Sequence, residues 1–162
     1  MIDRGYQNVG VIATKATINS AIYRNKIKSA NQKIRVNQLA TPLLAPMIEE
    51  GFYNGNISKS IISNYLEHED LRGIDALLLA CTHYPLIRRE IDEFYDGKVA
   101  ILDSTDLVSS EVKKILAAEN LLNAKRSGPD SFYVSDFTSS FEETAKNFYG
   151  EDIHLEAKHI WS

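Results

Sequence analysis

The single cysteine of the chain, Cys81, lies where an apolar segment gives way to a polar one. The apolar segment covers residues 76–80, and the residues that follow it are Cys81, Thr82, His83, Tyr84 and Pro85. We expect a buried strand to end at the thiol and a helix to begin at the proline. Because the positive end of a helix dipole favours a thiolate, this loop could provide a nucleophile or a base. A lone cysteine is more often a small buried core residue, but a core residue would not require these polar neighbours.

The composition is that of an ordinary globular protein and excludes several classes of function. Of the 162 residues, 44% are hydrophobic and 25% are charged, which is typical of one domain or two small ones. A formal net charge of -4 argues against nucleic acid as a partner, because nucleic-acid binding needs a basic face. One cysteine excludes an internal disulfide, and no apolar run has the length of a membrane span or the pattern of a secretion signal. We therefore expect a cytoplasmic protein with no membrane partner.

Apolar segments typical of strands alternate with segments of helical periodicity. Strands are expected over residues 9–13, 34–39, 74–80 and 99–102. Helices are expected over residues 17–28, with Thr17 as the N-cap, and over 42–50, 58–69 and 85–95. Strands that alternate with helices and are apolar on both faces indicate an α/β fold with a parallel sheet flanked by helices. Ligands of such sheets bind at the carboxyl ends of the strands, which is where Cys81 lies.

The last third of the chain follows a different pattern. After residue 103 we expect a long helix to about residue 122, a strand over 131–136, a helix over 141–149 and a strand over 153–160. Two strands joined by a helix bury too little surface for an independent domain. The sequence therefore predicts an α/β domain over residues 1–103 and a C-terminal βαβ tail of an incomplete second domain over residues 104–162.

Four segments of the chain carry a resemblance to a known family. Residues 79–86 read Leu-Ala-Cys-Thr-His-Tyr-Pro-Leu, and residues 10–17 combine a glycine with two threonines. Residues 41–51 are proline-rich and end in two glutamates and a glycine, and residues 101–104 read Ile-Leu-Asp-Ser. In this order the segments resemble the second catalytic loop, the start of the second domain, a glutamate-bearing segment and the returning strand of the glutamate racemases, within the aspartate/glutamate racemase family. The weakest match lies after Lys125.

The resemblance implies that the chain is the C-terminal portion of a two-domain enzyme. The family has two catalytic cysteines, one in each of two pseudo-symmetric α/β domains, and Cys81 resembles the second. The cysteine loop of the first domain has no counterpart in these 162 residues. Residues 1–103 would then form the second catalytic domain, and residues 104–162 would be a tail that packs on the missing first domain.

The activity that the resemblance implies is interconversion of L-glutamate and D-glutamate without pyridoxal phosphate, with no cofactor and no metal. Its physiological role would be to supply D-glutamate for peptidoglycan. Racemisation removes a weakly acidic α-proton from one face of the substrate and returns a proton to the other face, so it requires two acid–base groups on opposite faces. Cys81 would be one of them, and a chain with one of the two is expected to be inactive or nearly so.

Two further residues acquire catalytic roles from the resemblance. His83 is similar to the histidine of the family that assists the second thiol, since an imidazole can exchange a proton with a thiol. Glu49 is similar to a glutamate that hydrogen-bonds this histidine and would orient its ring. The adjacent Glu50 is the alternative for this position. A histidine here could also simply bond backbone at the start of a helix.

Three threonines, together with His83, are candidates for binding the substrate. Thr82 offers a hydroxyl and a backbone N–H near a helix N-terminus, and both groups can hold a carboxylate. Thr14 and Thr17 follow the first strand, at the same edge of the sheet as Cys81, and are similar to threonines that line the pocket in the family. The hydroxyls of Thr82 and Thr17 could instead cap helices.

Three other chemistries of an activated thiol fit the sequence less well. A cysteine phosphatase needs an arginine at the position that Ile87 occupies here, and Pro85 would interrupt its cradle of N–H groups. A metal site would have only Cys81 and His83, because the other three histidines lack the spacing of ligands. A redox sensor would lack a resolving cysteine.

Two alternatives stay within the resemblance. The substrate could be aspartate, because a difference of one methylene discriminates by only about 1–3 kcal/mol. The chain could also be a non-catalytic half-enzyme that at most binds an acidic amino acid. Some of the apolar residues at helical spacing after residue 103 would then pack on the missing domain, and they would cause self-association if left exposed. These residues are Leu107, Val108, Val112, Ile115, Leu116, Phe141, Ala145 and Phe148.

Overall fold

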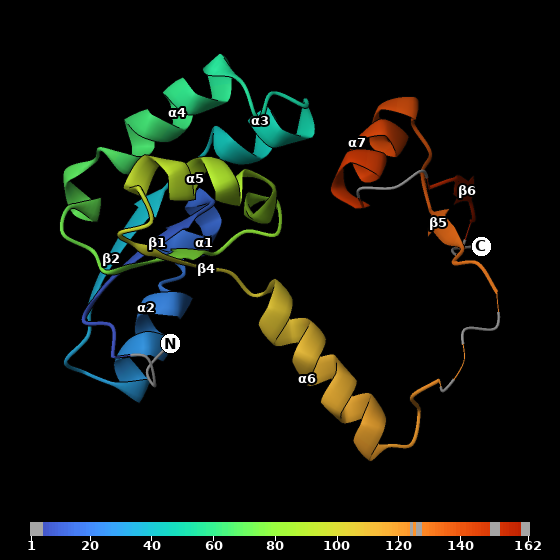
Figure 1. Ribbon diagram of the computed structural model, residues 1–162, viewed down its shortest axis with the longest axis horizontal. Coiled ribbons are helices and arrows are strands. Elements are labelled where there is room, and N and C mark those ends of the chain that lie inside the picture. The colour runs from blue at the N-terminus through green and yellow to red at the C-terminus, as the bar shows by residue number, and fades with distance from the viewer. Residues whose placement is uncertain (1–4, 124, 126–127, 150–152, 160–162) are drawn as a thin grey trace. The chain divides into compact units, whose positions relative to one another are not determined.

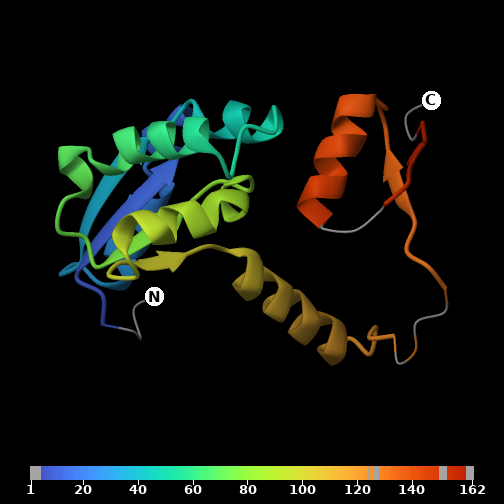
Figure 2. The same ribbon diagram turned by 45° about the horizontal axis from the view of Figure 1, so that its top comes forward.

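The computed structural model describes residues 5–123, 125, 128–149 and 153–159. The chain divides into two units, Met1–Ser110 and Glu111–Ser162. Figures 1 and 2 show the elements of both units from two directions. The division into functional domains after residue 103 stays a prediction.

The first unit is built on a sheet of four strands in the order β2-β1-β3-β4. The strands are β1 (Asn8–Ala13), β2 (Arg35–Ala40), β3 (Ala76–Leu79) and β4 (Ala100–Leu102). The central strands β1 and β3 consist almost entirely of buried residues, as strands do when helices cover both faces of a sheet. Every pairing in this sheet is parallel, so the predicted α/β fold with a parallel sheet is confirmed.

Helices and 3₁₀ turns that share one apolar core cover one face of the sheet (Figure 1). They are α3 (Leu44–Glu49), α4 (Asn56–Leu66), η2 (Glu69–Leu71), η3 (Tyr84–Ile87) and α5 (Arg88–Tyr95). Their apolar side chains form one core with Ile12 of β1 and with Leu77 and Leu79 of β3. This core holds the helices that precede and follow the cysteine loop against the same sheet face.

The opposite face is covered by α1 (Lys15–Asn19) and α2 (Ile22–Ala30). A second core there combines Val9 and Val11 of β1 with Ile27 of α2. Residues of β1 thus alternate between the two cores, which is the expected consequence of side chains that point to opposite faces along a strand.

The start of α1 differs from the prediction. Thr14, and not Thr17, is the N-cap, and its Oγ1 accepts a hydrogen bond from the backbone N–H of Thr17 at 3.5 Å. The single helix that we expected over residues 17–28 is two helices. Ala21 separates them because its φ of 52° lies in the left-handed region, which interrupts the helical path. Hydropathy periodicity carries no signal for such a local break.

A glycine leaves room for neighbouring side chains at one position of β1. A Cβ on Gly10 would lie 2.9 Å from Cδ1 of Ile74 and 3.0 Å from Cδ2 of Leu71. The absence of a side chain therefore lets the segment that enters β3 pack directly against β1.

The second unit contains a parallel pair of strands joined by a helix. Its elements are the C-terminal part of α6 (Thr105–Ala118), β5 (Phe132–Val134), α7 (Ser139–Tyr149) and β6 (Leu155–Ala157). β5 and β6 pair in parallel, so the predicted βαβ arrangement is confirmed. The predicted last strand is shorter than expected, and its residue 160 lies outside the described residues. None of the helices within the described ranges is long and apolar enough to cross a membrane.

Most residues of the apolar faces that we predict on α6 and α7 are exposed. The large side chains exposed there are Val108, Val112, Ile115, Phe141 and Phe148. Leu116 and Ala145 are half-buried, and the side chain of Leu107 lies outside the described residues. What covers these faces stays a prediction.

An ion pair fixes the end of the sheet at the exit of β4. The guanidinium of Arg88 pairs with the carboxylate of Asp103, and its Nη2 donates to the carbonyl oxygen of Ile101 at 2.9 Å. The other carboxylate oxygen accepts from the backbone N–H of Thr105, at the first residue of α6. Burial alone would raise the pKa of Asp103, but the hydrogen bonds from Thr105 and Arg88 lower it below its ordinary value.

We predict that Asp103→Asn lowers the free energy of unfolding on the order of 1 kcal/mol near neutral pH. The pKa of Asp103 is lowered in the folded state, so its contribution is present above the unfolded pKa and is lost as pH falls through the folded pKa. Urea denaturation at about pH 7 and about pH 3 should show a smaller loss at the lower pH. Asp96→Asn, at an exposed aspartate of the same unit, serves as the control. An equal loss at both pH values would contradict the ionic role.

Candidate active site

The candidate residues lie at one edge of the sheet because the strands before them are parallel. β1, β2 and β3 end at Ala13, Ala40 and Leu79, and their carboxyl ends point the same way. The backbone N–H of Thr41 donates to the carbonyl oxygen of Ala13, and that of Ala80 donates to Ile12, both at 2.9 Å. The loops that begin at Thr14, Thr41 and Cys81 therefore leave adjacent strands. This edge is where open α/β sheets bind ligands.

A thiol, an imidazole and a carboxylate form a chain of contacts at this edge. Sγ of Cys81 lies 3.7 Å from Nδ1 of His83, and Nε2 of His83 lies 3.0 Å from Oε1 of Glu49. The cysteine is half-buried, and the side chains of His83 and Glu49 are 30% and 54% exposed. The structure thus brings together the three residues that were predicted to be catalytic, in the order in which a proton could pass between them.

Each ring nitrogen of His83 has a separate partner, which defines what the imidazole can do. With a proton on Nε2 donated to Glu49, Nδ1 of the neutral ring is free of a proton and can accept one from the thiol. The imidazolium that results would be stabilised by the carboxylate and would donate to the thiolate. A thiol whose base is oriented by a third group has the arrangement of an activated acid–base residue.

Glu49 and Glu50 are distinguished by position. Glu49 is the last residue of α3 and contacts the imidazole, whereas Glu50 is the exposed C-cap residue of the same helix. The helix is short because Gly51 follows with a φ of 75°, a conformation that glycine adopts readily. Of the two adjacent carboxylates, Glu49 is therefore the one that lies beside His83.

The helix dipole has a smaller part in this site than we expected. The helix predicted from Pro85 begins instead with the four-residue 3₁₀ turn η3, and the α-helix α5 starts only at Arg88. The dipole of α5 therefore begins seven residues after Cys81. Because the effect falls off beyond the first turn, the imidazole of His83 is the closer influence on the thiol.

A buried tyrosine anchors the loop, and sequence reasoning did not single it out. The ring of Tyr84 is fully buried, and its hydroxyl lies 2.7 Å from Oγ1 of Thr41, which is itself buried. Burial raises the pKa of Tyr84 to about 12, which moves it further above neutral pH. This contact ties the residue after His83 to the loop that leads to α3 and Glu49. Its position in a strand-to-helix loop offered no signal, since a buried hydroxyl pair forms only in the folded chain.

The three threonines occupy the same edge in different ways. The hydroxyls of Thr14 and Thr17 lie 3.1 Å apart at the start of α1, where Thr14 also caps the helix. Thr82 is exposed between Cys81 and His83. Their role in binding a substrate stays a prediction.

Comparisons with known proteins agree on one family. The model of the Asp/Glu/Hydantoin racemase family matches residues 1–112. Glutamate racemase 3 of Caldanaerobacter subterraneus subsp. tengcongensis is 38% identical over 141 residues, which are 86% of this chain and 52% of that protein. The glutamate racemase of Neisseria meningitidis serogroup A is 38% identical over 146 residues, 90% of this chain and 54% of that protein. The chain thus spans about half the length of the curated relatives it matches.

Solved structures give the same result for the fold. The glutamate racemase of Francisella tularensis, in complex with D-glutamate, superposes with a TM-score of 0.82 at 35% identity and covers 94% of this chain and 57% of its own. The Thermus thermophilus glutamate racemase in complex with beta-chloro-D-alanine gives a TM-score of 0.78 at 30% identity, over 98% and 59% of the two chains. The resemblance seen in the sequence is confirmed, and this chain belongs to the Asp/Glu/Hydantoin racemase family.

Proposed function

We propose that this chain provides one half of an active site that interconverts L-glutamate and D-glutamate by proton transfer to and from a thiol. The observation that carries this proposal is the chain of contacts from Cys81 through His83 to Glu49 at the ligand-binding edge of the sheet. The relatives named glutamate racemases, and the relative solved with D-glutamate, support this choice of substrate. Aspartate is the alternative substrate.

In this proposal Cys81 works on one face of the substrate. As a thiolate it takes the α-proton, which leaves the electron pair on the α-carbon, and a second acid on the opposite face returns a proton there. In the reverse direction the protonated thiol donates to the α-carbon. Between turnovers His83 exchanges the proton of the thiol through Nδ1, while Glu49 stabilises the charged ring. Thr14, Thr17 and Thr82, with His83, would hold the substrate carboxylates.

The second acid–base group is proposed to come from protein outside these 162 residues. Cys81 is the only cysteine here, whereas the inversion needs two proton carriers. The exposed apolar residues Val108, Val112 and Ile115 of α6 would pack on that protein. The assembled enzyme would act in the cytoplasm and supply D-glutamate for peptidoglycan. The competing proposal is a non-catalytic half that only binds an acidic amino acid.

We predict that the chain by itself gives no measurable change in optical rotation with L-glutamate or D-glutamate. Co-expression with a segment that carries the opposite cysteine loop should restore turnover, and Cys81→Ser in that assembly should lower kcat by about 10²–10⁴-fold. Turnover that survives Cys81→Ser would exclude the proposed role of the thiol. Saturable binding of glutamate without turnover in any assembly would favour the non-catalytic half.

A second prediction concerns the contacts of the thiol and needs no assembled enzyme. Because Cys81 is the only cysteine, the rate of iodoacetamide alkylation reports on this residue alone. His83→Gln should slow alkylation near neutral pH by roughly three- to tenfold, since it removes the base beside the thiol, and Glu49→Gln should slow it less. The control is His154→Asn, at an exposed histidine of the second unit. Equal rates for all four proteins would show that the imidazole does not act on the thiol.

A further inference from the structure

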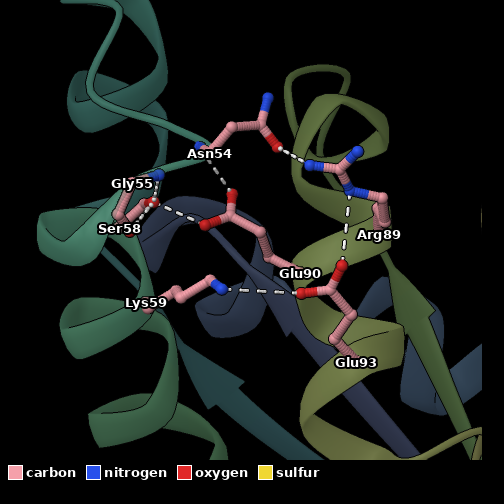
Figure 3. A network of polar contacts seen from close by, with 7 residues as sticks. All are labelled: Asn54, Gly55, Ser58, Lys59, Arg89, Glu90 and Glu93. Carbon is pink, nitrogen blue, oxygen red and sulfur yellow. Dashed lines mark hydrogen bonds and ion pairs between the residues drawn. The ribbon is translucent and has the colours of Figure 1, made fainter.

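A buried carboxylate lies outside the candidate site, on α5. Glu90 is only 4% exposed, and Figure 3 shows the polar contacts around it. Its Oε1 accepts a hydrogen bond from the hydroxyl of Ser58 at 2.5 Å, and its Oε2 accepts from the backbone N–H of Asn54 at 3.0 Å. A buried carboxyl group costs free energy unless it is hydrogen-bonded, so these two contacts hold it in one place.

The partners of Glu90 lie at the start of α4, one before its N-cap residue and one in its first turn. The N-cap residue of that helix is Gly55, which has no side chain to accept from the free backbone N–H groups. The hydroxyl of Ser58 accepts from the N–H of Gly55 at 3.0 Å, and the carboxylate of Glu90 accepts from the residue before it. Glu90 therefore places a negative charge at the N-terminus of α4 from a neighbouring helix, where the helix dipole favours it.

The other polar contacts between α4 and α5 are weaker. Lys59 and Glu93 lie 3.8 Å apart with both side chains more than half exposed, and exposed ion pairs contribute little. Arg89 donates to Oδ1 of Asn54 at 3.2 Å, also at the surface. A pocket of about 210 Å³ that opens to solvent is lined by residues of both helices, which are Lys59, Ile62, Ser63, Glu90, Glu93 and Phe94. The two helices also share the apolar core through Ile62 and Ile91, so the contacts of Glu90 add a buried polar link to this apolar contact.

The contacts of Glu90 join the segment that follows Glu49 to the segment that follows His83. Asn54 lies five residues after Glu49, at the end of the loop that follows α3. Glu90 lies seven residues after His83, in the first turn of the helix that follows the cysteine loop. A movement of α4 away from α5 would therefore change the separation of Glu49 and His83.

We propose that Glu90 is a positioning residue that holds Glu49 against His83 by fastening the start of α4 to α5. The catalytic consequence rests on the proposed function, because it requires the Glu49–His83 pair to take part in proton transfer. The geometric claim concerns only the contact between these two side chains, and it can be tested on this chain without turnover.

The test is the position of the side-chain nitrogen resonances of His83 in ¹⁵N NMR spectra of Glu90 variants. These resonances report whether Nε2 keeps its contact with Glu49, and Glu49→Gln gives their position when the carboxylate is lost. Glu90→Ala leaves the backbone N–H of Asn54 without its acceptor and leaves the Ser58 hydroxyl only the carbonyl oxygen of Gly55. It should therefore move the His83 signals toward the Glu49→Gln position. Glu90→Gln keeps the shape but loses the charge at the helix N-terminus, so it should cause a smaller shift in the same direction.

Two control variants separate positioning from a general loss of stability. Glu93→Gln changes an exposed acid one turn away on the same helix, and Ile27→Val weakens the core on the opposite face of the sheet. Neither should move the His83 signals. In a Glu49→Gln background Glu90→Ala should cause no further shift of these signals, because the contact that it positions is already gone.

Unchanged His83 signals in a folded Glu90→Gln or Glu90→Ala protein would overturn the proposal. A shift of these signals in either control variant as large as in the Glu90 variants would overturn it too. If Glu90→Ala does not fold, Glu90→Gln decides alone. The outcome is independent of catalysis. An assembled enzyme that fails to racemise glutamate would refute the proposed function while leaving the NMR result as it stands. In an active assembly, Glu90→Gln should lower kcat with little change in KM.

Discussion

The structure depends on the parallel pairing of β1 with β2 on one side and β3 on the other. Because the three strands run the same way, the loops that carry Thr14, Thr41 and Cys81 leave the sheet at one edge. Both faces of β1 are buried, so a one-residue slip would exchange the side chains that belong to the two cores. The register is therefore strongly determined, and with it the relative positions of residues that are far apart in the sequence.

The geometry at that edge changes which group is expected to act on the thiol of Cys81. The sequence points to a helix dipole, yet the turn after His83 is a 3₁₀ turn and the α-helix begins later. The groups near Cys81 are instead an imidazole and, beyond it, a carboxylate. This matters for chemistry because a dipole only favours one charge state of the thiol, whereas an imidazole can also accept and return its proton.

Two buried polar contacts join segments that neighbour Glu49 and His83 in the sequence. Tyr84 joins the cysteine loop to Thr41 at the end of β2, and Glu90 joins the start of α4 to α5. Both contacts link a segment near Glu49 to a segment near His83. Buried hydrogen bonds of this kind are costly to leave unmade, so they limit how far the two segments can move apart.

The sequence by itself determined the strands, the parallel α/β fold and the cysteine loop, because apolar runs and their alternation with helical periodicity are properties of neighbouring residues. It failed at Thr17 and at the break near Ala21, where a hydroxyl and a single left-handed residue decide the helix ends. It also could not separate Glu90 from the other charged residues of α5. Only the tertiary structure decided that Glu90 is buried and that Glu49 contacts His83, because both depend on where helices distant in the sequence meet.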